Sequence, residues 1–222
     1  ITATSVAAGI TVGGDNATGP SQAGTVAFAD PGDVNALFVV FDETVDQASA
    51  ETAAAYQYNS STNPTTATLV EPRAVRLVFP SAVSAGFQLD VTSAAAVDTA
   101  KNAAAGTLSL AVIEDTTAPF IVSSSASIQE GVGGDVIEIV FDEQVDTSGG
   151  FDVNDFTVTV GGVSQRVGTV LWDSQTFTAS ILLEDMTDGS SAEVSIDGIA
   201  DLAGNTPVAA LTTSVVVGGD ST

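Results

Sequence analysis

A six-residue motif occurs twice in this chain, one hundred residues apart. Phe-Asp-Glu-Thr-Val-Asp at 41–46 returns as Phe-Asp-Glu-Gln-Val-Asp at 141–146, and an apolar run precedes each copy. A second pair of motifs follows in the same order, Asp-Thr-Ala-Lys-Asn at 98–102 and Asp-Leu-Ala-Gly-Asn at 201–205. Two motifs repeated at nearly the same offset indicate an internal duplication. We therefore predict two tandem domains rather than one large domain.

The boundary between the domains is expected in the segment 113–119, Ile-Glu-Asp-Thr-Thr-Ala-Pro. Pro119 disfavours helix for the residue before it and stiffens the chain at this point. The predicted domains are residues 1–113 and 114–222. Because the link is short, the two domains are expected to be stacked end to end.

Within each repeat, short apolar or alternating runs are separated by Gly, Asp, Ser and Asn turns, which is the pattern of β-strands. In the second repeat, strands are expected near residues 120–126, 135–141, 155–160, 165–172, 175–183, 191–197 and 208–217. The first repeat follows the same plan, with a short helical turn expected in Gln47–Tyr56. Such strands favour an all-β fold of two tandem Ig-like antiparallel β-sandwich domains.

The charge of the chain restricts its partners. It has 28 acidic and four basic residues, a net charge of −24. Nucleic acid and anionic lipid are bound mainly through Lys and Arg, so neither is an expected partner. No apolar run approaches the ~20 residues that span a bilayer, so membrane insertion is not expected. The acidity favours cation binding, although it also keeps secreted proteins in solution.

The chain has no Cys and no His. This excludes disulfides, thiol chemistry, Cys/His zinc sites and catalytic triads that need an imidazole. A glycosidase would need two carboxylates across a cleft, which two stacked sandwiches do not obviously provide. We therefore expect no enzymatic activity. The chain opens at Ile1 without Met or a signal peptide, as expected of a mature or excised segment.

Three of these features together resemble a known family. They are an apolar strand ending in Phe-Asp-Glu-x-Val-Asp, a late Asp-x-Ala-Gly-Asn turn, and the linker Asp-Thr-Thr-Ala-Pro at 115–119. They resemble the bacterial Ig-like domains that occur in tandem in S-layer proteins and large secreted adhesins. The resemblance covers nearly the whole chain and is weaker in the first repeat, where Lys101 replaces Gly204. It implies a secreted, cell-surface structural module that is often calcium-dependent.

Acidic residues of the second repeat are expected to meet at one pole. In an Ig-like sandwich the B–C and F–G loops share a pole, and strand A starts there. Carboxylates brought together repel one another unless a cation such as Ca²⁺, which prefers oxygen ligands, neutralises them. We therefore predict one Ca²⁺ at the domain junction, bound by some of Asp115, Glu143, Asp201 and Asn205, with Asp142, Asp146 and Glu114 as further candidates. The alternative is that Asp201 and Asn205 cap a turn and Glu143 is solvated.

The first repeat carries a weaker version of the same set: Glu43, Asp46, Asp98 and Asn102. Lys101 adds a positive charge there, and the repeat lacks a linker acid of its own. Placed end to end, residues 217–222 and 1–6 resemble the internal linker 112–117 followed by 118–123. Asp220 of another copy, stacked head to tail, would then supply the missing acid and propagate a fibre. The alternative is that both ends are artificial boundaries in a disordered tail.

Two classes of function remain at this stage. The first is a structural module of a surface array, fibre or large adhesin, stiffened by calcium at the domain junctions. The second is an adhesive binding module that recognises glycan or protein through polar loops or an edge strand. A binder should expose an aromatic cluster or a distinctive loop, for which the stretch Asn59–Thr66 is the only mild candidate.

Overall fold

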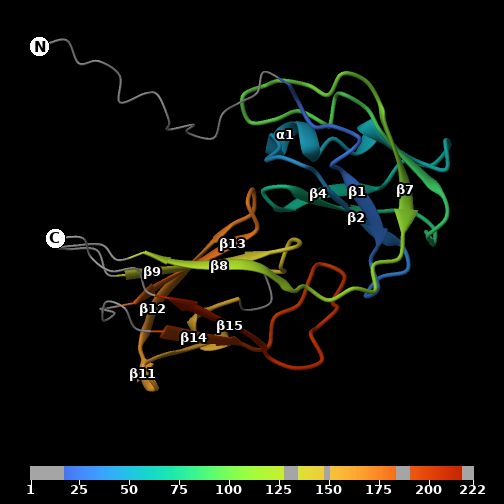
Figure 1. Ribbon diagram of the computed structural model, residues 1–222. Helices are drawn as coiled ribbons and strands as arrows, with labels where there is room; N and C mark the ends of the chain where they lie inside the picture. The colour runs from blue at the N-terminus through green and yellow to red at the C-terminus, as the bar shows by residue number, and fades with distance from the viewer. Residues whose placement is uncertain (1–17, 128–134, 148–150, 184–190, 217–222) are drawn as a thin grey trace, which may run out of the picture.

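A computed structural model of the chain describes residues 18–127, 135–147, 151–183 and 191–216, and its regular structure is nearly all β (Figure 1). The first half contains β1 (Val26–Ala29), β2 (Ala36–Val40), α1 (Gln47–Ala50), η1 (Ala53–Ala55), β3 (Tyr56–Tyr58), β4 (Thr66–Glu71), β5 (Ala74–Val78), β6 (Gln88–Val91) and β7 (Leu108–Ile113). The second half contains β8 (Ile121–Ser127), β9 (Asp135–Phe141), η2 (Val153–Asp155), β10 (Phe156–Val160), β11 (Val163–Gln165), β12 (Val167–Asp173), β13 (Thr178–Leu183), β14 (Ser191–Ile196) and β15 (Leu211–Val216). No helix in the described part of the chain is long and apolar enough to cross a membrane.

Both halves have the same strand order. In the second half, β12-β13-β9-β8 forms one sheet and β11-β10-β14-β15 forms the other. In the first half, β4-β5-β2-β1 and β7-β6-β3 repeat this order, and a short parallel ladder between β1 and β7 joins them into one seven-stranded sheet. The corresponding β8 and β15 share no ladder among the described residues, but the hydroxyls of Ser124 and Thr213 lie 2.7 Å apart. The predicted all-β sandwich fold is confirmed.

The expected strands of the second repeat agree with seven of its eight strands to within a few residues. The exception is β11, since no strand was predicted between residues 160 and 165. Gly161 and Gly162 adopt φ of 57° and 81°, a left-handed turn that lets β11 fold back and pair with β10. The helical turn expected in Gln47–Tyr56 is present as α1 and η1.

Each half has its own hydrophobic core between its layers. The first core takes its buried residues from Ala27 to Val112, and the second from Ile137 to Val215. In β9 the inward residues Ile137, Ile139 and Phe141 are buried, whereas Glu138 points outward and is exposed. This alternation is expected of a strand that is covered on one face only.

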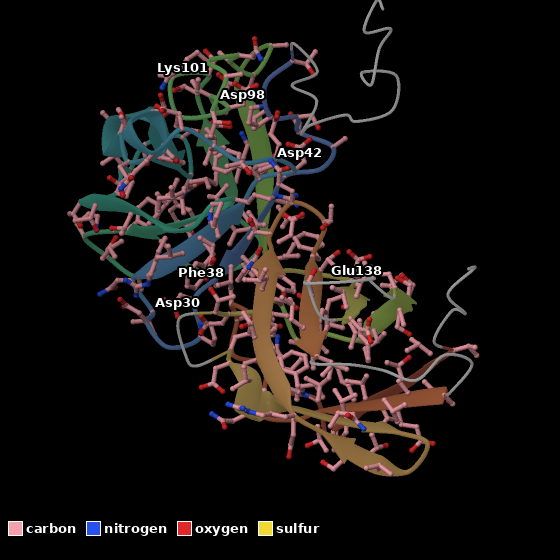
Figure 2. All side chains as sticks on the ribbon, turned by 90° about the vertical axis from the view of Figure 1, so that its left-hand side faces the viewer. Asp30, Phe38, Asp42, Asp98, Lys101 and Glu138 are labelled. Atoms are coloured by element: carbon pink, nitrogen blue, oxygen red, sulfur yellow. The ribbon has the colours of Figure 1, made fainter. Side chains whose placement is uncertain are left out.

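Strand β2 departs from that alternation because it is buried at every residue. Its outward residues Phe38 and Val40 pack with Phe28 and Ala74 in a third apolar cluster, which Ala203 of the second half completes. The equivalent of Phe38 in the second half is the exposed Glu138, and both are labelled in Figure 2.

The predicted end-to-end stacking is wrong about which surface of the first half the second half contacts. The late turn of the second half packs against the outer face of the first half's β1-β2-β5 layer. The physical reason is that this outer face is apolar and would otherwise be exposed to water.

Replacing Phe38 by Glu, the residue of the second copy, should weaken the contact between the halves. Phe38 is 9% exposed, and the loss of a buried ring combined with the burial of a charge should cost about 3 kcal/mol or more. Urea denaturation measures this loss, and small-angle scattering should report a larger radius of gyration. The matched control is Glu138→Phe, expected to change stability by less than about 0.5 kcal/mol. A cost below about 1 kcal/mol for Phe38→Glu would contradict the importance of this face.

Candidate metal centre at the domain junction

Arg73, which directly precedes β5, connects the two halves of the chain. Its side chain is buried, and its Nε donates to the carbonyl of Phe41 at 2.7 Å. Its Nη1 donates across the junction to the carbonyls of Ser174 (2.9 Å) and Gln175 (3.0 Å). The guanidinium carbon also lies 4.7 Å from the centre of the Phe177 ring, close enough for a cation–π contact. The turn between β12 and β13 is thus held against the first half by an arginine that the sequence reading did not single out.

Two more of the hydrogen bonds among the described residues cross the junction. The side-chain amide of Gln175 donates to Thr44 Oγ1 at 2.7 Å, and the hydroxyl of Thr147 donates to the carboxylate of Glu71, which is buried. Burial lowers the pKa of Arg73, while neighbouring carboxylates act in the opposite direction. Since most of its hydrogen bonds go to backbone carbonyls, the position of this arginine depends on both backbones.

Three carboxylates gather beside these contacts. Asp115 lies in the link after β7, Glu143 follows β9, and Asp201 lies in the turn between β14 and β15. One oxygen from each lies within 4.8 Å of the others, and no other such group of metal-ligating side chains occurs among the described residues. The loop topology therefore brings together three of the four leading candidates named from the sequence.

The fourth candidate, Asn205, holds the turn. Its backbone N–H and its side-chain amide each donate to the carboxylate of Asp201, both at 2.8 Å, and the side chain also donates to the carbonyl of Asp115 at 3.1 Å. In the first half, Asn102 donates to Asp98 in the same way, at 2.7 and 2.8 Å. The turn-capping role of the Asp–Asn pair is therefore present in both halves. Asp201 differs from Asp98 in also facing Asp115 and Glu143.

The electrostatics of the group favour a cation. One carboxylate oxygen of Glu143, Oε1, is buried and accepts no hydrogen bond from any described residue. Burial, followed by the charges of Asp115, Asp201 and Asp142, raises the pKa of Glu143 from 4.5 to about 8. Burial also raises the pKa of Asp201, against the lowering effect of the Asn205 hydrogen bonds. The residues present offer only oxygen ligands, so they fit a hard cation such as Ca²⁺.

The remaining candidates of the second half lie elsewhere or have other roles. Asp142 Oδ1 accepts a hydrogen bond from the backbone N–H of Phe120 at 2.8 Å and so fixes the start of β8. Glu114 is exposed, and the half-buried Asp146 is bound through its backbone N–H to Ala200. None of these three belongs to the group of Asp115, Glu143 and Asp201.

In the first half, a lysine pairs with one of the predicted ligands. Lys101 forms an ion pair with Asp46. Asp46 also caps α1 by accepting from the backbone and hydroxyl of Ser49, and the lysine first, then Ser49, lowers the pKa of Asp46 to about 2. Figure 2 shows Lys101 and Asp98 close together at the end of the first half that lies away from the second half. The sequence predicts an ammonium among these acids, and the structure pairs it with Asp46.

The N-terminal alignment made from the sequence is wrong. Ser21 donates its backbone N–H to Asp42 Oδ1 at 3.0 Å, just as Phe120 does to Asp142. Pro20 is therefore the counterpart of Pro119, and Ile1 is not the counterpart of Ala118. The Gly19-Pro20 dipeptide is the signal that marks this point in the sequence. Asp220, the acid that the sequence predicted another copy would supply to this pole, lies outside the described residues.

The carboxylate group borders a pocket of about 330 Å³ between the two halves. Residues of the first half that line it include Val26, Phe28, Arg73 and Ile113, and residues of the second half include Asp115, Glu143, Gln144, Phe177 and Leu202. Gln144 replaces Thr44 of the first repeat, and the sequence reading assigned it no role.

No protein-family model matches the chain, and no curated protein matches it. Two solved structures of the bacterial S-layer protein SbsC are similar over 46% of this chain at 21% identity and a TM-score of 0.39, covering 14% (domains 1–6) and 24% (N-terminal part) of those chains. A third, Bacteroides ovatus mixed-linkage glucan utilization locus SGBP-B in complex with a mixed-linkage heptasaccharide, is similar over 83% of this chain and 42% of its own, at 15% identity and a TM-score of 0.29. The chain spans less than half of each, and similarities with TM-scores this low carry no argument about function.

The metal-free chain should lose stability as the pH rises. Because the pKa of Glu143 is higher in the folded state (about 8) than its ordinary 4.5, the folded chain binds this proton more tightly. That contribution is fully present below pH 4.5 and is lost as the pH rises through about 8. Melting temperatures in excess chelator should fall over this window, and Glu143→Gln should flatten the trend. An equal slope in the variant would contradict the assignment.

Exchange of Lys101 and Gly204 should alter cation binding in opposite directions. Both residues have left-handed backbones, with φ of 76° and 78°, which glycine adopts without strain and lysine does not. Lys101→Gly relieves that strain and frees Asp46, so calorimetry with CaCl₂ should show tighter binding in the first half. Gly204→Lys should strain its turn and weaken binding in the second half. Unchanged isotherms for both variants would rule out this charge effect.

Proposed function

We propose that this chain is an extracellular structural module of a surface array, fibre or large adhesin, in which calcium stiffens the junction between two β-sandwich domains. The observation that carries the proposal is the group of Asp115, Glu143 and Asp201, with its unpartnered buried oxygen, beside the contacts that join the halves. No catalytic role is proposed. The domain limits 1–113 and 114–222 and the secreted location are part of the same proposal.

The position of the group supports a stiffening role. Asp115 belongs to the link, whereas Glu143 and Asp201 belong to the second half, so one ion on all three would tie the link to that half. The link is already held to Asn205 through the carbonyl of Asp115. Three carboxylates supply three to six oxygens, and Ca²⁺ takes about six to eight, so backbone carbonyls or water would complete the shell. Glu114, Asp142 and Asp146 remain secondary candidates.

Calcium should stabilise the chain, and its removal should lower the melting temperature. At a free concentration about a hundredfold above Kd, the expected gain is about 2.7 kcal/mol. Magnesium should substitute poorly, because it requires a tighter octahedral site and gives up its water reluctantly. Differential scanning fluorimetry in EGTA, calcium and magnesium measures the effect. Identical melting curves in EGTA and calcium would refute the calcium site.

Matched variants locate the ion. Asp115→Asn and Glu143→Gln should each remove most of the calcium response, because each takes one negative charge from the group. Glu43→Gln changes the counterpart of Glu143 in the first half and should leave the tight binding intact. A loss of response in Glu43→Gln equal to that in Glu143→Gln would place the ion elsewhere.

The assembly of further copies, head to tail, is a second part of the proposal. The proposed partners are neighbouring repeats or other copies of the same protein. Neither nucleic acid binding nor membrane insertion is proposed. The adhesive alternative, recognition of glycan or protein, is favoured by one specific feature, the pocket between the halves.

A further inference from the structure

One residue that lines the pocket between the two halves carries a buried acceptor that the fold does not satisfy. Gln144 is 4% exposed and lines this pocket. Its Nε2 donates to the carbonyl of Val145 at 2.8 Å. This hydrogen bond fixes the orientation of the side-chain amide, so the remaining polar atom is the acceptor Oε1. Oε1 accepts no hydrogen bond from any described residue. A buried acceptor without a donor costs about 1–3 kcal/mol, so a bound group that donates to it gains that interaction.

The same pocket has an accessible apolar wall. Val26 and Ile113 line it from β1 and the end of β7, and they are 45% and 49% exposed. Leu202 and Phe177 contribute from the second half. The volume of about 330 Å³ lies within the range of small-molecule sites, roughly 300–1,000 Å³.

The charges around the pocket select the kind of ligand. Asp115, Asp142 and Glu143 line it and disfavour an anion. Arg73 also lines it, but three of its hydrogen bonds go to backbone carbonyls. A bound Ca²⁺ would offset two of the three negative charges of the carboxylate group, so the advantage of an organic cation over a neutral ligand is reduced there. The other features of the lining are the acceptor of Gln144 and the aliphatic side chains of Val26 and Ile113.

We propose that this pocket binds a neutral, hydroxyl-rich ligand, with the chemistry of a saccharide unit. A sugar hydroxyl donates to Gln144 Oε1, and the C–H face of the ring packs against Val26 and Ile113. This inference adds a binding function to the proposed structural module and rests on it for the calcium that offsets most of the carboxylate charge. Because the ligand bridges residues of both halves, its binding favours the docked arrangement of the domains.

The test uses the whole chain, labelled with ¹⁵N, in millimolar calcium and in excess EDTA. Methyl α-mannopyranoside, methyl β-glucopyranoside and methyl β-galactopyranoside serve as saccharide probes, and n-butylamine serves as the cationic probe. At least one glycoside should shift amide resonances at Val26, Ile113 and Gln144 in calcium. Gln144→Thr, which installs the first repeat's residue, should weaken that binding about fivefold to tenfold, the value of one hydrogen bond. Val163→Ser, on the exposed and distant β11, is the control and should leave it unchanged.

Each of the other outcomes contradicts one part of the proposal, either the calcium site, the ligand site or the ligand class. If calcium raises the melting temperature but no glycoside shifts the pocket resonances, the ligand site is wrong and the calcium site stands. If a glycoside shifts them while calcium has no effect, the calcium site is wrong and the pocket stands. Preference for n-butylamine would overturn the ligand class. Loss of calcium affinity in Gln144→Thr, equal to its loss of glycoside affinity, would make Gln144 an ion ligand instead.

Discussion

The covering of the outer face of β2 is the contact on which the arrangement of the two halves depends. Phe38 and Val40 point away from the first core, and the second half keeps them from water by laying its late turn over them. Arg73 fixes the position of this packing, because its donors reach carbonyls on both sides of the junction. Apolar burial supplies a non-directional attraction, whereas the arginine selects one orientation.

The sequence predicted the parts of the fold that local patterns encode. The duplication, the strands of the second repeat and the convergence of Asp115, Glu143 and Asp201 follow from spacing and loop topology. The packing of the halves did not follow, although its signal was present: the run 36–41 is apolar throughout, whereas 136–141 is interrupted by Glu138. Arg73 and Gln144 had no signal of this kind, because their roles depend on contacts between halves that no single repeat contains.

The site and the interface impose opposite demands on the junction. Apolar packing and the Arg73 contacts draw the halves together, whereas the link and two loops of the second half bring Asp115 against Glu143 and Asp201. The raised pKa of Glu143 reflects the cost of charging this carboxylate where burial and like charges oppose it. A proton or a cation relieves that cost.

The interface between the halves cannot simply be repeated further along an array. Ser125 pairs with Glu138 as Phe28 pairs with Phe38, so Ser125 is the counterpart of Phe28. In the same way, Thr178 pairs with Val140 as Ala74 pairs with Val40, so Thr178 is the counterpart of Ala74. The outer face of the second half thus presents Ser125 and Glu138 where the first presents two phenylalanine rings. A third domain docking there in the same way would bury a charge without a partner, which is strongly unfavourable. Repetition in a longer protein would therefore need a different contact after every second domain.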